Sequence, residues 1–217
     1  MSVRVKICCI SSLEEAQAAI QFGAAALGLV GNMPSGPGVI SDQLIEHIAR
    51  SVPPAVASFL LTSHTTATEI IAHQQKVKTT TIQVVDALTE GSHAQIRAAL
   101  PGIQVVQVIH VIDERSIEEA LREAETADAL LLDSGNPNLA VKELGGTGRV
   151  HNWELSRKIC EQSPKPVFLA GGLRAENVQA AIEQVQPFGL DLCSGVRTNG
   201  KLDLHKLERL FEAVHRV

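Results

Sequence analysis

Two glycine-containing turns are the features of this sequence best suited to bind a ligand. Gly171-Gly172 and Ser194-Gly195 each follow an apolar run with the length of one buried strand, and each precedes a helical pattern. Glycine lets bare backbone N–H groups approach a ligand closely, and a following helix adds the positive end of its dipole. Two such turns side by side would hold one phosphate group. Ordinary tight strand-to-helix turns are the alternative.

Four polar residues near predicted strand ends could carry out proton chemistry: Lys6, Cys8, Asp133 and Asp191. The ammonium of Lys6 favours the thiolate of Cys8, which makes Cys8 a candidate base or nucleophile, although a free cysteine is also a common small core residue. Asp133 is a candidate acid or, alternatively, a turn residue. Asp191 is expected to pair with Lys6. A thiol base facing a carboxylic acid suits an isomerisation, in which one group takes a proton from carbon and the other protonates an oxygen.

The elements that must position these residues alternate along the whole chain. Apolar, β-branched runs predict strands at 3–10, 25–30, 56–61, 79–85, 103–109, 129–133, 167–170 and 189–193. Capping residues and helical periodicity predict helices at 11–23, 41–50, 66–75, 92–100, 114–125, 152–160, 174–184 and 204–215. A long loop is expected at 134–151. Strict alternation forces parallel strands with the helices outside them.

Eight strand–helix units fill the chain, so we expect one α/β domain, a (β/α)8 barrel over residues 1–217; an open, doubly wound sheet is the weaker alternative. Alternation in the first strand directs Lys6 and Cys8 into the barrel, and places Cys9 on the outer face. Barrel active sites lie at the carboxyl ends of the strands, and the loops after strands seven and eight often bind phosphate. The two glycine turns fall at those loops, which favours a sugar phosphate as the substrate.

Composition excludes several other classes of function. The formal net charge is −5, aromatic residues make up 3% of the chain, and there is no tyrosine, which argues against a nucleic-acid partner. The four cysteines lack metal-ligand spacing and do not resemble a disulfide framework. No apolar run approaches about 18 residues, so a membrane span is not expected. A reducing, cytoplasmic location is the expectation, for a monomer or a homodimer.

Several motifs occur in the order found in one enzyme family. The segment 5–10, VKICCI, resembles the opening V-K-I-C-G-I of phosphoribosylanthranilate isomerase, an enzyme of tryptophan biosynthesis. The segment 145–148 with Asn152-Trp153 resembles its G-G-T/S-G…D/N-W loop. Gly171-Gly172-Leu173, Glu176-Asn177-Val178 and the segment 191–196, DLCSGV, resemble its G-G-L, E-N-V and D-V-S-S-G-V. The resemblance runs along the whole chain.

This resemblance implies an Amadori rearrangement, which converts an aminoaldose phosphate into an aminoketose phosphate. Cys8 would be the general base that takes the C2′ proton, and Asp133 the general acid that protonates the ribose ring oxygen. The implied substrate-binding residues are Lys6, Gln83, Gly146 and Asp191, and the implied phosphate-binding residues are Gly171, Gly172, Ser194 and Gly195. The partner would be a small phosphorylated sugar-amine. No cofactor and no metal is implied.

The sequence departs from the family pattern at the positions that recognise anthranilate. The family's loop after the second strand carries an arginine that pairs with the anthranilate carboxylate, whereas residues 33–40 here contain no cation. The family's V-Q-L-H-G has become residues 82–86, IQVVD, which keeps Gln83 but lacks the histidine. Cys9 stands where the family has glycine, and Arg197 where it often has glutamate. Arg197 is one alternative source of the missing cation.

Three readings of function are therefore open. The first is a phosphoribosylanthranilate isomerase with an altered anthranilate pocket. The second is a diverged paralogue that isomerises a different phosphorylated sugar. It is favoured because the anthranilate carboxylate would have no arginine partner here, and an unpaired buried carboxylate weakens binding by several kcal/mol. The third is a protein that merely binds such a sugar, against which the presence of both Cys8 and Asp133 argues.

Overall fold

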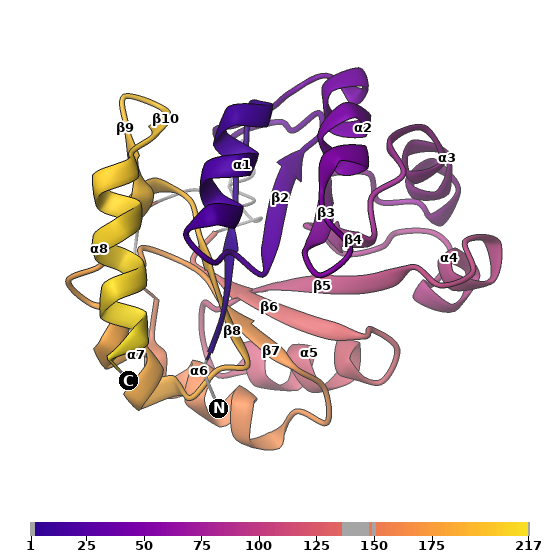
Figure 1. Cartoon of the computed structure of the whole chain (residues 1–217). Helices are drawn as coiled ribbons and strands as arrows, with labels where there is room; N and C mark the ends of the chain where they lie inside the picture. The colour runs from indigo at the N-terminus through magenta and orange to yellow at the C-terminus, as the bar shows by residue number, and fades with distance from the viewer. Residues whose placement is uncertain (1–2, 136–147, 149–150, 217) are drawn as a thin grey trace.

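Eight parallel strands close into a barrel in the computed structural model, which describes residues 3–135, 148 and 151–216 (Figure 1). The strands follow one another around the barrel in sequence order, and β1 pairs with both β2 and β8. They are β1 (Arg4–Ile7), β2 (Ala26–Val30), β3 (Ala57–Thr62), β4 (Thr81–Val84), β5 (Gln104–His110), β6 (Ala129–Asp133), β7 (Val167–Leu169) and β8 (Gly189–Leu192). The predicted barrel is confirmed, and the open sheet is wrong for these strands.

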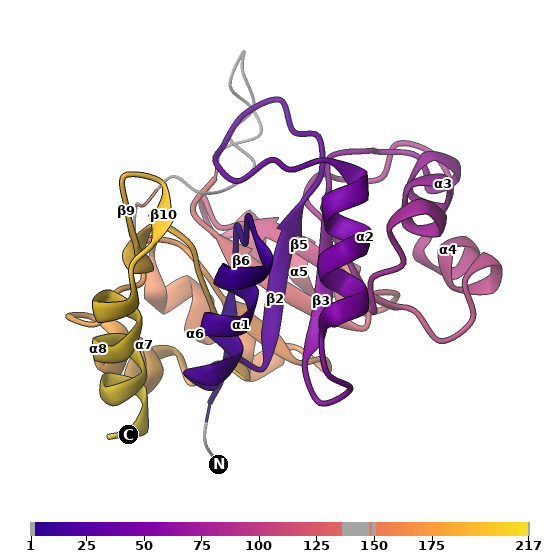
Figure 2. The same cartoon turned by 45° about the horizontal axis from the view of Figure 1, so that its top comes forward.

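Helices connect the strands on the outside of the barrel. They are α1 (Leu13–Gln21), α2 (Asp42–Ser51), α3 (Ala67–Val77), α4 (His93–Ala99), α5 (Arg115–Ala124), α6 (Trp153–Gln162), α7 (Val178–Val185) and α8 (Leu204–His215). The side chains of Ser12, Ser41, Thr66 and Ser92 accept a backbone N–H from the first turn of α1 to α4, as N-caps do. The start of β1 and the end of α8 lie at the same end of the barrel, opposite the hairpin of β9 (Arg197–Thr198) and β10 (Lys201–Leu202) (Figure 2).

Apolar side chains fill two layers. Residues between the strands and the helices include Val5 and Ile7, both buried, while the barrel interior holds Phe59, Leu61 and Leu131. The period-two alternation of β1 therefore directs Lys6 and Cys8 inward, as the sequence predicts. Among the described residues, no helix combines the length and apolar character needed to cross a membrane.

Cys9 does not follow the alternation. The sequence places it on the outer face with Val5 and Ile7, but its backbone has φ +62° and its side chain lines a pocket inside the barrel mouth. A left-handed φ is uncommon for a residue other than glycine. The turn at Cys9 also sends Ile10 into the outer apolar layer, opposite to the expected arrangement.

The two glycine turns lead into structures shorter than the predicted helices. After β7 the helix begins at Val178 rather than Arg174, because residues 174–177 form a turn in which the Arg174 N–H donates to the side chain of Asn177 (2.8 Å). After β8 come a 3-10 helix η1 (Ser194–Val196) and a hairpin of β9 (Arg197–Thr198) and β10 (Lys201–Leu202) before α8. A full helix dipole therefore does not begin at Ser194.

Candidate active site

A pocket opens at the carboxyl ends of the strands, where a barrel's active site is expected. It encloses about 700 Å³ of space, part of which is open to solvent. Most of the predicted site residues line it, although they come from five different strands or their following loops: Cys8, Gln83, Asp133, Gly171, Gly172, Asp191 and Ser194. Residues separated by up to 186 positions are thus brought around one volume.

Lys6 lies beneath the pocket rather than in its wall. Its side chain is fully buried, and its Nζ lies 2.7 Å from Oδ1 of Asp191, its register partner across β1 and β8. The ammonium also lies 5.3 Å from the centre of the Phe59 ring. Burial by itself would lower the pKa of Lys6, but the charge and hydrogen bond of Asp191, together with the nearby Cys8 and Cys9, outweigh it and the pKa is raised. The predicted Lys6–Asp191 pair is confirmed, and Lys6 affects the pocket through Asp191.

Cys8 reaches the pocket because Gly28, on the neighbouring strand β2, has no side chain. A Cβ atom at Gly28 would lie 2.8 Å from the Cys8 Sγ and 3.1 Å from the Lys6 Nζ. The thiol and the ammonium therefore share the space over Gly28. Sequence reasoning missed this residue, although a glycine inside a buried strand is a recognised sign of close approach.

Asp133 ends β6 and is 7% exposed. Its Oδ1 accepts the N–H of Ser134 (2.8 Å), so the turn role and the pocket position are both realised. Burial raises the pKa of the Asp133 carboxyl, which favours the protonated form that a general acid needs. The neighbouring strand β5 contributes His110, which is paired in register with Asp133; its Nε2 lies 3.0 Å from the Val85 carbonyl oxygen. Sequence reasoning did not single out His110.

The glycine turns after β7 and β8 belong to the same side of the pocket as Asp133 and Asp191. Gly171 and Gly172 have φ +83° and +62°, values that favour glycine, and Asn177 Nδ2 donates to the Gly172 carbonyl (3.0 Å). A Cβ at Gly195 would overlap the carbonyl oxygen of Leu173, so only glycine lets the turn after β8 lie against the turn after β7.

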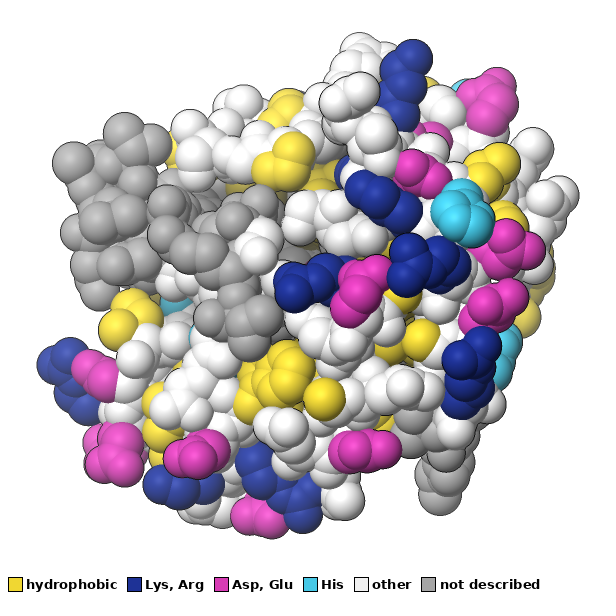
Figure 3. Space-filling view, turned by 90° about the vertical axis from the view of Figure 1, so that its left-hand side faces the viewer, with side chains coloured by type: hydrophobic (Ala, Val, Ile, Leu, Met, Phe, Trp, Pro, Cys, Tyr) yellow, Lys and Arg dark blue, Asp and Glu magenta, His cyan; other side chains and the backbone are white. Residues whose placement is uncertain are grey.

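Gly195 lines an adjoining hollow rather than the main pocket. The two hollows share Gly172 and Ser194, and the second also has Lys206 and Arg209 from α8, which sequence reasoning missed. Lys206 Nζ donates to the Arg197 carbonyl (2.7 Å), and Arg209 pairs with Glu176 (2.9 Å). On the surface that includes α8, side chains of both signs are interspersed (Figure 3).

Arg197 does not supply a cation to the pocket. Its guanidinium is buried, lies 3.0 Å from a carboxylate oxygen of Glu15, and donates to the carbonyl oxygens of Cys8 and Cys9. Burial would raise the pKa of Glu15, but the hydrogen bond and charge of Arg197, together with the backbone N–H groups of Leu202 and Ser11, outweigh it and the pKa is lowered. Arg197 therefore stabilises the chain just after β1, and its alternative role as the missing cation for the substrate carboxylate is wrong.

The wall formed by β2, β3, β4 and the loop after β2 is mainly apolar. It includes the apolar side chains of Val30, Met33, Pro37, Leu61 and Val85, together with Ser35, Gly36 and Gln83. None of the pocket-lining residues that the structure describes is Lys or Arg. The predicted Gly146 lies outside the described residues, as do Gly145 and Thr147, whereas Gly148 borders both hollows. Within the described part of the chain, no cluster of His, Cys, Asp and Glu is arranged to hold a metal ion.

Comparison with known proteins matches this chain to one enzyme family. Residues 5–213 match the family model described as N-(5'-phosphoribosyl)anthranilate (PRA) isomerase. A relative of that name from Methanosarcina acetivorans is 35% identical, covering 99% of this chain and 94% of its own. Another from Gloeothece citriformis is 33% identical, with the same two shares.

Solved structures agree with the sequence matches. The phosphoribosyl anthranilate isomerase of Thermotoga maritima is 29% identical with a TM-score of 0.81, covering 99% of this chain and all of its own. A structure of such an isomerase in complex with reduced 1-(o-carboxyphenylamino)-1-deoxyribulose 5-phosphate is 27% identical, with a TM-score of 0.78 and the same coverage. The likeness thus extends over the whole barrel.

Proposed function

The chain belongs to the N-(5'-phosphoribosyl)anthranilate isomerase family, and from this we propose that it catalyses the Amadori rearrangement of an N-phosphoribosyl amine, converting the aminoaldose phosphate into the aminoketose phosphate. One observation carries the proposal: a thiol, a raised-pKa carboxyl and two glycine turns line one pocket at the barrel mouth. We propose that this site acts on a small phosphorylated sugar-amine.

In the proposed mechanism, Asp133 and Cys8 each handle one proton. Asp133, kept protonated by burial, donates its proton to the furanose ring oxygen as the bond from C1′ to that oxygen breaks. The nitrogen lone pair forms a C1′=N bond, and Cys8 as thiolate removes the proton from C2′. The resulting enol-amine tautomerises to the ketone, so the reaction is an isomerisation with no net change of oxidation state.

The remaining site residues hold the substrate and the two catalytic groups in place. Backbone N–H groups around Gly172, Ser194 and Gly195 bind the phosphate; all three residues line the hollow beside the main pocket, and Gly172 has the positive φ that favours glycine. Asp191, fixed by Lys6, orients the reacting end of the sugar from the pocket floor. This places phosphate at one wall and the C1′–C2′ bond between Cys8 and Asp133.

One observation favours a second candidate, in which the amine is not anthranilate. The wall that remains for the N-substituent is mainly apolar, with Ser35 and Gln83 as its polar side chains, and its described residues include no cation for a carboxylate. An uncharged aryl or alkyl amine suits such a wall better, because a carboxylate left without a partner retains its desolvation cost. The reaction and its catalytic residues are the same in both cases.

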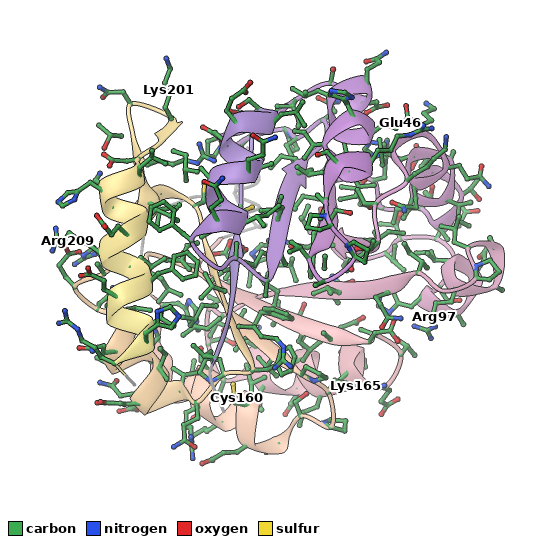
Figure 4. All side chains as sticks on the ribbon, viewed as in Figure 1. Glu46, Arg97, Cys160, Lys165, Lys201 and Arg209 are labelled. Carbon is green, nitrogen blue, oxygen red and sulfur yellow. The ribbon has the colours of Figure 1, made fainter. Side chains whose placement is uncertain are left out.

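The test is an isomerase assay on the purified chain with N-(5'-phosphoribosyl)anthranilate and with a carboxylate-free analogue. Cys8→Ala and Asp133→Asn should each lower kcat by about 10²–10⁴-fold, the usual contribution of a general acid or base. Cys160→Ala is the matched control, since Cys160 lies on α6 at the other end of the molecule from Lys201 of the β9–β10 hairpin (Figure 4). Turnover at the wild-type rate by both active-site variants would overturn the assignment.

A further inference from the structure

Three of the four cysteines meet at the pocket: Cys8, Cys9 and Cys193. Cys9 and Cys193 are two departures from the family motifs quoted above, where they replace a glycine and a serine. Cys9 and Cys193 lie side by side in the barrel, because β1 pairs with β8 and the Cys8 N–H donates to the Leu192 carbonyl (2.7 Å). The sulfur atoms of Cys9 and Cys193 lie 2.7 Å apart.

The backbone holds the Cys9 side chain in this position. Its left-handed φ of +62° costs conformational energy in a residue with a Cβ, and such strain persists only where the surroundings fix it. The loop after β2 leaves the necessary room, because a Cβ on Gly38 would lie 2.5 Å from the Cys9 Cβ. On its other side, the Cys9 Sγ lies 3.6 Å from the Pro37 carbonyl oxygen.

The two sulfurs differ in chemical state and in access. Their contact lowers the pKa of the Cys193 thiol and raises that of Cys9, and the nearby charge of Arg197 lowers the pKa of Cys193 further. Cys193 is partly exposed, whereas Cys8 and Cys9 are 6% and 5% exposed. Since thiolate character and access govern oxidation, Cys193 is the sulfur that an oxidant attacks first.

We propose that Cys9 and Cys193 form a modification site, a dithiol that reacts with hydrogen peroxide or an organic hydroperoxide and so spares the catalytic thiol of Cys8. The Cys193 thiolate attacks the peroxide, forming an S–O bond as the O–O bond breaks and hydroxide leaves, which gives a sulfenic acid. The Cys9 thiol then attacks this sulfur, a disulfide forms and water leaves. The protein loses two electrons and two protons, which reduce hydrogen peroxide to two waters, or an organic hydroperoxide to one alcohol and one water. A dithiol reductant reverses the step.

The first test identifies the linkage without using activity. The reduced full chain is treated with hydrogen peroxide, alkylated and mapped by mass spectrometry under non-reducing conditions. We expect one crosslink, between Cys9 and Cys193, while Cys8 and Cys160 still react with the alkylating reagent. The Cys160→Ser control should give the same crosslink, because burial raises the pKa of the Cys160 thiol to about 12 and so disfavours its reaction with peroxide. A crosslink through Cys8, or oxidation of Cys8 while Cys9 and Cys193 stay reduced, would overturn the proposal.

The second test measures protection and rests on the proposed function. After peroxide treatment and then dithiothreitol, wild type should recover most of its activity. Cys193→Ser and, independently, Cys9→Gly, which suits the φ at that position, should recover several-fold less, each relative to its own untreated rate. Equal recovery in all three proteins would refute protection. Absence of isomerase activity in the untreated wild type would instead count against the proposed function, and the crosslink map would still decide the modification site.

Discussion

The two walls of the pocket differ in how they are built. The wall from β1, β6, β7 and β8 carries Cys8, Asp133, Asp191 and the glycine turns, each held by a specific contact such as the Lys6–Asp191 pair. The wall from β2 to β4 presents mainly apolar side chains, with Ser35 and the amide of Gln83, whose buried Oε1 has no hydrogen-bond partner among the described residues. Under the proposed function, the proton chemistry and the phosphate site follow the family pattern, while recognition of the amine differs.

The largest effect is expected from removing the Lys6 ammonium, which lies beneath the wall from β1, β6, β7 and β8. Lys6→Met leaves the Asp191 carboxylate buried without its partner, so the free energy of unfolding should fall by about 3–5 kcal/mol. Urea denaturation measures it. Arg50→Met is the control, because that ion pair with Glu46 is exposed and its loss should cost about 0–1 kcal/mol. Equal losses in both variants would show that the Lys6 pair does not support the wall.

The phosphate site can be disrupted at one glycine. Gly195→Ala places a Cβ on the Leu173 carbonyl oxygen, which forces the two turns apart. A displacement of about 1 Å can lower kcat/KM by about 10²-fold, and protection of the folded state by inorganic phosphate should weaken with it. Thermal unfolding with and without phosphate measures the second effect. Gly102→Ala is the control for a glycine substitution away from the pocket: it precedes β5, its φ of +88° strains an alanine, and no atom lies within 4 Å of the added Cβ. Unchanged phosphate protection in Gly195→Ala would contradict a main-chain anion site.

The pH dependence of kcat tests the acid on the same wall. Because burial raises the pKa of Asp133, its protonated form persists above the ordinary carboxyl range and is lost as pH rises through the raised value. Activity should therefore fall on the alkaline side, by about tenfold per pH unit beyond that pKa. The Asp133→Asn variant should lose this limb along with most of its rate. An unchanged alkaline limb in that variant would assign the limb to another group.

The smallest effect is expected from adding a cation to the apolar wall. Met33→Arg brings a guanidinium to the loop after β2, where it can pair with a substrate carboxylate. The KM for N-(5'-phosphoribosyl)anthranilate should drop by about tenfold, equivalent to about 1.4 kcal/mol, while the KM for a carboxylate-free analogue should not. A similar change for both substrates would mean that the arginine acts on packing rather than on charge.

The barrel, the inward direction of Lys6 and Cys8 and the clustering of the site residues could be predicted, because alternation, capping and strand-end chemistry are local signals. Cys9 could not, since a left-handed φ breaks the alternation and depends on the room left by Gly38. The ion pair of Arg197 with Glu15 joins residues 182 positions apart, so no spacing reveals it. His110 was missed because nothing local distinguishes it from an ordinary strand-end histidine.

The difference between the two walls is tested most directly by steady-state kinetics of the wild-type chain on two aminoaldose phosphates that differ only in the anthranilate carboxylate. Our account predicts that kcat is similar for both, since Cys8 and Asp133 perform the same proton transfers, and that the carboxylate-bearing substrate has no advantage in KM. A kcat/KM at least tenfold higher for the carboxylate-bearing substrate would contradict it.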